Sequence, residues 1–202
     1  MTPRTHLATH RSLLPRTLGA AAVAAAAVAA VLTGQAPTDA ATSAPSAAAA
    51  PTCFGETATI RGTGLLRGTP GDDVIVAGDA GTEVQAGGGD DRICGAFIVY
   101  GGTGDDRIAF FRTGYAEAEL RGQAGRDRIY SSTTFAYLYG GQDDDVLVGG
   151  GGEQWVLGEG GNDRLVGGRG PDHLLGGTGR DRADGGAGRD DCDAELRRAC
   201  EG

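Results

Sequence analysis

A nine-residue motif repeats along the chain from position 59 to position 193. Its clearest copies read Gly-Gly-x-Gly-x-Asp-x-(aliphatic)-x, as in GGTGDDRIA at 101–109, GEGGNDRLV at 158–166 and GGTGRDRAD at 176–184. Stepping by nine from Thr59 gives fifteen copies. Such a repeat constrains the fold more than local propensity does, because each unit buries its apolar face only against neighbouring copies.

The eighth position of the repeat tests this phase. It is Ile, Leu or Val in all copies but the last two, which have Ala183 and Cys192. Val99 and Ile108 fit if the turn before Val99 is three residues short and Phe110-Phe111-Arg112 restores the phase. The other aliphatic residues of this column are Leu66, Ile75, Val84, Ile93, Leu120, Ile129, Leu138, Leu147, Val156, Leu165 and Leu174.

Each nonamer contains one turn and one short strand. Glycine reaches positive φ freely, so we expect positions 1–6 to turn tightly and to hold no strand. Positions 7–9 then form a strand with residue 8 pointing inward. Two nonamers make a coil, and parallel coils stack about 4.8 Å apart, which gives a rod roughly 36 Å long. The predicted fold is all-β: a parallel β-roll, or right-handed β-solenoid, of about fifteen half-coils.

Position 6 distinguishes the two edges of this rod, because successive nonamers alternate between them. On one edge the position reads Gly64, Thr82, a deletion, Ala118, Ala136 and Gln154, followed by Asp172 and Asp190. On the other edge it is always aspartate: Asp73, Asp91, Asp106, Asp127, Asp145, Asp163 and Asp181.

Carboxylates stacked this closely repel one another unless a cation lies between them. Oxygen-only ligands favour Ca²⁺ over transition metals. We therefore expect six calcium sites between the seven aspartates of the first file and one between Asp172 and Asp190. With dissociation constants of about 0.1 mM and about 1 mM free calcium, each site would add about 1.4 kcal/mol. Calcium binding is thus predicted to stabilise a rod whose apolar core is thin.

The copies quoted above, with GGRGPDHLL at 167–175, make the chain resemble the RTX, or haemolysin-type, calcium-binding repeat family. The resemblance covers about two thirds of the chain. It implies a β-roll in which the nine position-6 aspartates and main-chain carbonyls hold Ca²⁺. The chain is most similar to the small, stand-alone secreted members of the family. The position-5 residues are weaker ligand candidates that otherwise solvate the turn: Asp72, Asp90, Asp105, Asp144 and Asn162.

The N-terminal region has the layout of a secretory signal peptide. Three arginines precede an apolar stretch at 18–32, and Thr38-Asp39-Ala40 is a plausible cleavage site. The alternative, a membrane anchor, needs about 20 apolar residues. We predict a signal peptide at 1–40, a disordered linker at 41–52, an N-terminal cap at 53–58, the β-roll at 59–193 and a C-terminal cap at 194–202. The mature chain should be secreted and should not span a membrane.

The four cysteines suit disulfide bonds in an exported chain. Cys53–Cys94 would tie the N-terminal segment to an early coil and cover the first coil, and Cys192–Cys200 would close the tail. We expect 194–199 to form a short helical turn with Leu196 facing the last core position. Zinc is the alternative, but the chain has no C-x-x-C motif.

Composition and motifs restrict the function further. Without positions 1–40 the chain has 15 basic and 26 acidic residues, which argues against nucleic acid as a partner. No catalytic constellation stands out, and His173 is expected to be solvated. We predict a calcium-binding structural or binding module without catalysis. The alternative is an extracellular adhesin or accessory domain that contacts a surface, a protein or a glycan through an aromatic patch.

Two rows of side chains leave their roles open. The aromatic residues of the patch either contact a partner or staple coils that lack metal: Phe110, Phe111, Tyr115, Phe135, Tyr137 and Tyr139. The position-7 arginines either bind sugar or phosphate or pair with neighbouring acids: Arg92, Arg107, Arg128, Arg164 and Arg182.

Overall fold

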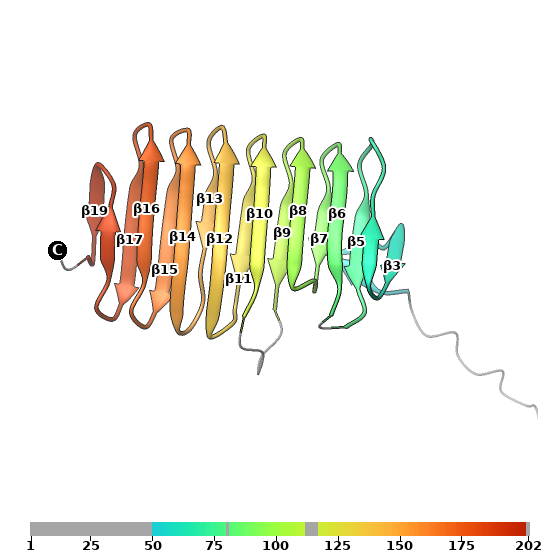
Figure 1. The fold of residues 1–202 in the computed structure, drawn as a ribbon, viewed down its shortest axis with the longest axis horizontal. Helices are drawn as coiled ribbons and strands as arrows, with labels where there is room; N and C mark the ends of the chain where they lie inside the picture. Colours follow the sequence, from blue (N-terminus) through green and yellow to red (C-terminus); the bar gives the residue numbers. More distant parts are fainter. Residues whose placement is uncertain (1–49, 80, 112–116, 201–202) are drawn as a thin grey trace, which may run out of the picture. The chain divides into compact units, whose positions relative to one another are not determined.

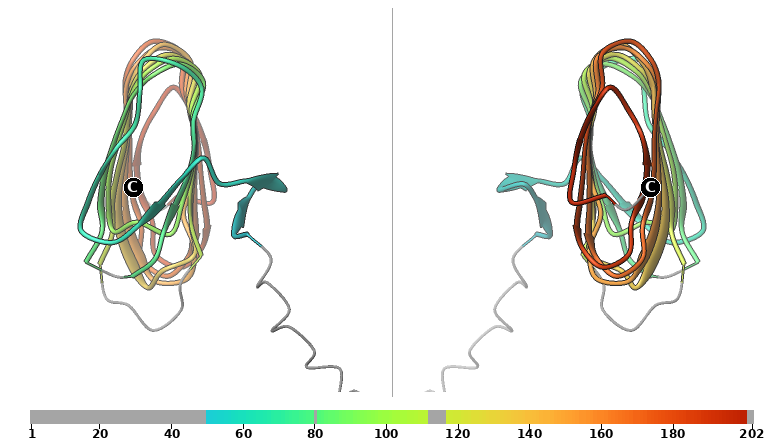
Figure 2. Two further views of the ribbon diagram at one scale, coloured as in Figure 1. Left: turned by 90° about the vertical axis from the view of Figure 1, so that its right-hand side faces the viewer. Right: turned by 90° about the vertical axis from the view of Figure 1, so that its left-hand side faces the viewer.

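The computed structural model describes residues 50–79, 81–111 and 117–200. The predicted signal peptide at 1–40, most of the predicted linker, Arg112 and Tyr115 lie outside these residues. The described part is a parallel β-solenoid of about seven turns, as predicted. Figure 1 shows the coils stacked in sequence order, and Figure 2 shows the flattened cross-section of the coils.

Two sheets form the walls of the solenoid, and all the neighbouring strands within each sheet are parallel. The nine-stranded sheet contains β3 (Ile60–Gly62), β5 (Val74–Ala77), β7 (Arg92–Cys94), β9 (Arg107–Phe110), β11 (Arg128–Ser131), β13 (Val146–Val148), β15 (Arg164–Arg169), β17 (Arg182–Ala187) and β19 (Leu196–Arg198). The eight-stranded sheet contains β4 (Leu65–Arg67), β6 (Glu83–Gly88), β8 (Ile98–Thr103), β10 (Glu119–Ala124), β12 (Phe135–Gln142), β14 (Glu153–Gly160), β16 (His173–Thr178) and β18 (Asp191–Asp193).

The described residues contain no helix. Among them, accordingly, nothing qualifies as a helix long and apolar enough to cross a membrane.

The position-8 column is the core. From Ile75 to Cys192 each of these side chains is at most 5% exposed. The shortened turn is confirmed, because Val99 pairs with Val84 on one side and with Leu120 on the other. Phe110 adds to this core, since it is buried and its ring packs edge-on against Phe97 with 5.0 Å between centroids.

Many of the strands are longer than the three predicted residues, because they continue into the glycine-rich positions, whereas others such as β13 keep the predicted length. In β15 the residues after position 9 still belong to the strand, and Gly168 pairs with Gly186 of β17. Backbone hydrogen bonds to the coils on either side hold these glycines extended despite their low strand propensity. The tight turn is therefore confined to about four residues, which brings the position-1 glycine and the position-6 residue of one nonamer close together.

An antiparallel hairpin, β1 (Thr52–Cys53) and β2 (Glu56–Thr57), precedes the first coil. The predicted Cys53–Cys94 disulfide is present and ties the hairpin to β7. Glu56 forms an ion pair with Arg92 (2.9 Å). Arg92 occupies position 7 of its nonamer and therefore lies on the outer face of the sheet. The hairpin thus covers the side of the early coils and not their open end, which corrects the expected position of this segment (Figure 2).

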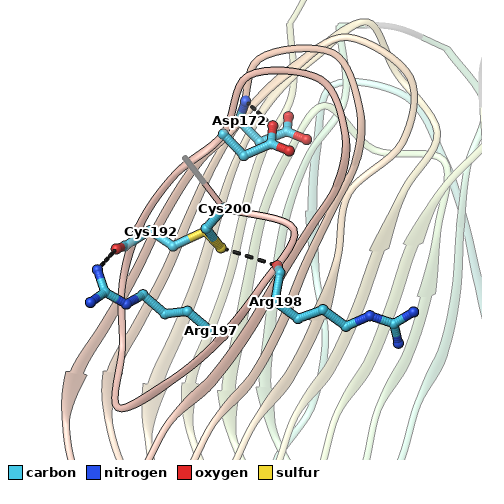
Figure 3. Close-up of a disulfide and its surroundings, with 6 residues drawn as sticks. Asp172, Cys192, Arg197, Arg198 and Cys200 are labelled. Atoms are coloured by element: carbon cyan, nitrogen blue, oxygen red, sulfur yellow. Dashed lines mark hydrogen bonds between the residues drawn. A yellow bond between two sulfur atoms is a disulfide. The ribbon is translucent and has the colours of Figure 1, made fainter. Parts of the chain in front are cut away.

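The C-terminal tail is a strand and not the helical turn that was expected. Pairing of β19 with β17 satisfies its backbone, with Leu196 opposite Arg182 and Arg197 opposite Ala183. Leu196 therefore points outward and is 51% exposed. Arg197 donates to the carbonyl oxygen of Cys192 (3.1 Å) at the last coil. The predicted Cys192–Cys200 disulfide closes this tail (Figure 3).

Candidate metal-binding turns

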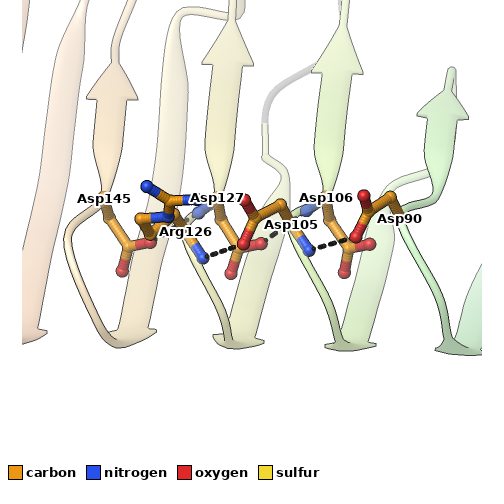
Figure 4. Close-up of polar contacts among 6 residues, drawn as sticks. All are labelled: Asp90, Asp105, Asp106, Arg126, Asp127 and Asp145. Atoms are coloured by element: carbon orange, nitrogen blue, oxygen red, sulfur yellow. Dashed lines mark hydrogen bonds and ion pairs between the residues drawn. The ribbon is translucent and has the colours of Figure 1, made fainter.

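The seven aspartates from Asp73 to Asp181 line one edge of the solenoid, called here the Asp-rich edge. Each lies immediately before a strand of the nine-stranded sheet and is at most 6% exposed. From Asp91 onward, the Oδ1 atom of each accepts the backbone N–H of the aspartate one coil earlier. Asp127 N–H, for example, donates to Asp145 Oδ1 at 2.7 Å. We call this file the inner ladder (Figure 4).

The second carboxylate oxygen of these aspartates has no donor. Among the described residues, Oδ2 is buried and without a hydrogen-bond partner in Asp91, Asp106, Asp127, Asp145, Asp163, Asp172, Asp181 and Asp190. A buried acceptor without a donor costs about 1–3 kcal/mol, and more when it is charged. A repeated row of such atoms points to a cation as the absent partner.

The position-1 glycine of the same turn makes room for this oxygen. A Cβ at Gly122 would collide with Oδ2 of Asp127, and one at Gly140 with Oδ2 of Asp145. A Cβ at Gly101 would meet Asp106 Oδ2 and would also lie 2.7 Å from the carbonyl oxygen of Gly122. At Gly101 and at Gly140, a carboxylate oxygen and a main-chain oxygen of the next coil therefore converge on the glycine. Hard cations such as Ca²⁺ take this set of ligands.

Burial dominates the electrostatics of the inner ladder. It raises the pKa of Asp106 to about 8, although the amide of Asp91 donates to this carboxylate and opposes the shift. Burial likewise raises the pKa of Asp127 and of Asp145 to about 7. Neighbouring carboxylates add a smaller contribution in the same direction. A bound divalent cation would reverse this preference and favour the ionised forms.

The position-5 residues form a second, exposed file, called here the outer ladder. Asp105 Oδ1 accepts the backbone N–H of Arg126 one coil later (2.9 Å), and the Arg126 guanidinium lies 3.0 Å from Asp105 Oδ2 (Figure 4). The amide of Asn162 donates to Asp144 Oδ1 in the same way (2.7 Å). These backbone bonds lower the pKa of Asp105 and of Asp144. The outer carboxylates thus reach forward along the rod, whereas the inner ones reach back.

Asp73 differs from the other members of the Asp-rich edge. Its Oδ1 accepts from the Thr59 hydroxyl (3.1 Å). Its Oδ2 accepts from the backbone N–H (2.8 Å) and the hydroxyl (2.9 Å) of Thr69. Both oxygens therefore have donors at the N-terminal end of the ladder.

Glu195 is a member of the inner ladder that the nonamer phase did not identify. Its Oε2 accepts the backbone N–H of Asp181 at 2.8 Å, as each later aspartate does for the one before it. The last coil is four residues shorter than the usual eighteen, since Leu196 pairs with Arg182. The only signal in the sequence is that Glu195 directly precedes an aliphatic residue, as each position-6 aspartate nearly does, shortly after the repeat ends at position 193.

The opposite edge is mostly neutral. Gln154 is fully buried, and its side-chain amide donates to the carbonyl oxygen of Thr133 (3.2 Å). The Thr133 hydroxyl donates to the Phe135 carbonyl (2.8 Å) and contacts the Ser131 hydroxyl (2.9 Å). At the C-terminal end this edge becomes acidic, with Asp172 and Asp190 in successive coils, and Asp190 Oδ1 accepts the backbone N–H of Asp172 (3.0 Å).

The aromatic residues of β12 and β14 lie on the outer face of the eight-stranded sheet, whereas Phe110 of the predicted patch is buried in the core and Phe111, next to it, is exposed. Trp155 stacks on His173, with 4.2 Å between ring centroids, and lies 6.4 Å from Tyr137. The Arg121 guanidinium covers Tyr139 at 3.9 Å. Ring faces are thus directed at neighbouring coils, which favours the staple interpretation. His173 is accordingly half-buried rather than fully solvated.

The position-7 arginines lie in register along the outer face of the nine-stranded sheet. Arg92 pairs with Arg107, Arg107 with Arg128, and Arg164 with Arg182. They therefore form a stripe that is separate from the buried carboxylates of the turns.

Within the described ranges, no group of three or more His, Cys, Asp or Glu side chains gathers as a metal site. Each turn offers carboxylates from adjacent coils only, so main-chain carbonyls must complete any coordination.

A family model described as an RTX calcium-binding nonapeptide repeat (4 copies) matches residues 61–80, 67–97, 98–109, 137–153 and 157–192. Together these segments include just over half of the 202 residues. No curated protein and no solved structure gives a significant match. The family match confirms the resemblance seen in the repeated motif.

Proposed function

Since the chain belongs to the RTX calcium-binding nonapeptide repeat family, we propose that it is a secreted protein whose solenoid folds when Ca²⁺ binds in its turns. The observation that carries this proposal is the row of buried Oδ2 atoms without donors, which from Asp106 onward each face a glycine that leaves space beside them. Calcium would supply the positive charge that these oxygens lack and would bridge successive coils.

The proposed ligands are the position-6 aspartates together with main-chain carbonyls of the turns. The strongest candidates are those whose Oδ2 lacks a donor: Asp91, Asp106, Asp127, Asp145, Asp163, Asp181, Asp172 and Asp190. Asp73 is the weakest candidate, because both of its oxygens already accept hydrogen bonds. The outer ladder is assigned to hydrogen bonding between coils and not to the metal.

Calcium binding and folding should be coupled. The ligands converge only when coils stack, so an ion that binds the folded chain alone shifts the equilibrium toward it. Six sites that each add about 1.4 kcal/mol would contribute about 8 kcal/mol at about 1 mM free calcium. That is comparable to the whole stability of an ordinary domain.

A calcium titration of the mature chain, followed by far-UV circular dichroism, tests this function. We expect little β signal in a strong chelator and a cooperative gain at millimolar Ca²⁺. Mg²⁺ at the same concentrations is the matched control, because it requires a tighter octahedral shell and loses water reluctantly. A spectrum that chelation leaves unchanged would contradict calcium-dependent folding.

Secretion and the absence of catalysis are part of the same proposal. The two disulfides suit an oxidising compartment, and the family is generally structural. N-terminal sequencing of protein recovered from culture medium should show removal of about 40 residues. Retention of the uncleaved chain in the cell would contradict secretion.

The alternative function, adhesion through the aromatic patch, has less support. A sugar stacks on an open ring face, but the Trp155 and His173 rings face each other and Tyr139 lies under Arg121. Substitution of Trp155 by Ala should therefore reduce stability and leave binding to glycan arrays unchanged. Specific glycan binding that this substitution abolishes would favour the alternative.

A further inference from the structure

The C-terminal loop closed by Cys192 and Cys200 lies where the next coil of the solenoid would begin. Asp181 and Asp190 are the last repeat aspartates of the two edges, because the residues from 194 onward do not continue the nonamer. Both are almost fully buried, with 0% and 2% exposure, and both have an Oδ2 atom without a hydrogen-bond partner. In interior turns the following coil supplies the remaining oxygens, so these end turns need another source.

On the Asp-rich edge this source is the Glu195 carboxylate. Its Oε2 accepts the backbone N–H of Asp181 at 2.8 Å. In the same way, Asp181 Oδ1 accepts the backbone N–H of Asp163 one coil earlier (2.9 Å). The longer glutamate side chain compensates for a coil that turns back early. Glu195 thus places a carboxylate beside Asp181 as each repeat aspartate does beside its predecessor.

On the opposite edge the source is the carbonyl oxygen of Ala199. A Cβ at Gly167 would lie 2.7 Å from the carbonyl oxygen of Gly185 in the next coil, beside Asp172 Oδ2. At the following step, a Cβ at Gly185 would meet the Ala199 carbonyl oxygen and would lie 2.6 Å from Asp190 Oδ2. The Ala199 carbonyl therefore takes the place of the next glycine carbonyl.

The disulfide holds both oxygens in place. Ala199 has a φ of 48°, a left-handed conformation that is unfavourable for a residue with a Cβ. The adjacent Cys200 is bonded to Cys192, whose strand β18 pairs with β16. Glu195 lies within the same loop, so one covalent closure positions ligands at both edges.

We propose that this loop completes one terminal calcium site on each edge, between Asp181 and Glu195 and between Asp190 and the Ala199 carbonyl. The inference rests on the proposed function and extends it to atoms outside the repeat. It makes the Cys192–Cys200 disulfide a determinant of calcium stoichiometry, whereas the loop closed by Cys53 and Cys94 supplies no terminal ligand.

The test is calcium stoichiometry, measured on the oxidised mature chain by native mass spectrometry and by equilibrium dialysis. Glu195→Gln keeps an oxygen for the backbone N–H of Asp181 but removes the charge. Glu117→Gln is its control, because both glutamates are exposed and Glu117 is away from the C-terminal loop. A double Cys192→Ser, Cys200→Ser variant opens the loop, and Cys53→Ser with Cys94→Ser removes the other disulfide. Far-UV spectra at saturating calcium check that each variant folds.

We expect Glu195→Gln to lower the affinity for one calcium ion by about tenfold, so that this ion is lost when calcium is limiting. The Cys192/Cys200 variant should lose two ions, and both controls should bind as the wild type does. Unchanged binding by both test variants would overturn the inference, and loss of one ion in the cysteine variant would overturn the Ala199 site. A wild-type chain that binds no calcium would overturn the proposed function itself.

Discussion

On the Asp-rich edge, each turn from Asp91 to Asp181 buries a carboxylate whose Oδ2 has no donor. On the opposite edge, the corresponding middle positions bury Ala118, Ala136 and Gln154. Both edges join the same two sheets around the same aliphatic core, so the backbone path is nearly shared. What differs is how the interior of the turn is filled.

The difference shows which part of the solenoid depends on metal. The Gln154 side-chain amide donates to Thr133, and the Thr133 hydroxyl donates to Phe135, so neutral protein groups fill that turn, and its orphan acceptor, Gln154 Oε1, carries no charge. The carboxylates of the other edge place like charges in successive coils and raise one another's pKa. A neutral edge can thus hold the coils in register while the acidic edge responds to calcium.

The largest predicted effect is that of pH, because it acts on the whole inner ladder at once. In the metal-free fold the pKa is raised to about 8 for Asp106, about 7 for Asp127 and Asp145, and about 6 for Asp91 and Asp163. An unfolded aspartate titrates near 3.9. The folded chain therefore binds more protons than the unfolded chain does between these pH values. The stability that this proton binding contributes is fully present below about pH 4 and is lost as pH rises through about 6 to 8.

Without calcium, the β signal should thus be stronger at about pH 4 than at about pH 8. With calcium the order reverses, because protons compete for the ligands, and the calcium midpoint should fall about tenfold or more between pH 5.5 and 7.5. Circular dichroism titrations at several pH values measure both. A midpoint independent of pH would mean that the inner carboxylates do not bind the ion.

The second prediction removes one rung of the inner ladder. Asp127→Asn keeps an oxygen for the Asp106 amide but removes a charge shared by two adjacent sites. If each site contributes about 1.4 kcal/mol, the loss is about 3 kcal/mol at about 1 mM calcium. Ala136→Ser, a buried substitution on the neutral edge, is the control for a local packing change. Equal shifts of the calcium midpoint in the two variants would refute the asymmetry between the edges.

The third prediction extends the acidic pattern onto the neutral edge. Gln154→Asp places a carboxylate beside Asp172, whose Oδ1 already accepts the backbone N–H of residue 154 (2.9 Å). Gly149 leaves space next to the new side chain. The variant should bind one additional ion, and in metal-free buffer it should lose about 1 kcal/mol with the bond to Thr133. Ala118→Asp has no acidic neighbour at position 6 and should add no ion. Native mass spectrometry separates the two outcomes.

Periodicity was sufficient to predict the coils, the core and the file of aspartates. Position 8 is visible in the sequence because aliphatic residues recur among many glycines, and the three-residue gap before Val99 follows from the same column. The coils, the core and the file of aspartates are local features of the nonamer, so a single sequence is enough to define them. The two disulfide pairings were also predicted, from the position of each cysteine relative to the ends of the repeat.

The ends of the solenoid could not be predicted in this way, because the repeat no longer applies there. Ala194 to Ala199 has good helix formers, but pairing with β17 determines its conformation. The same pairing places Glu195 in the ladder through a coil of non-standard length. The sequence distinguished Asp145 as a position-6 ligand from Asp144 as a weaker position-5 candidate, but only the structure shows that their side chains reach in opposite directions along the rod.

The smallest predicted effect compares these two neighbours on the Asp-rich edge. Asp144→Asn keeps an acceptor for the Asn162 amide in the exposed outer ladder, so it should leave the ion count unchanged and barely move the calcium midpoint. Asp145→Asn removes a buried charge from two proposed sites and should raise the midpoint strongly. The substitutions are chemically identical and one residue apart, so the two sites differ only in the direction and the burial of the side chain. Equal loss of calcium in the Asp144→Asn and Asp145→Asn variants would show that the outer ladder also binds the ion. The two edges would then differ by two metal-binding carboxylates per coil and not by one.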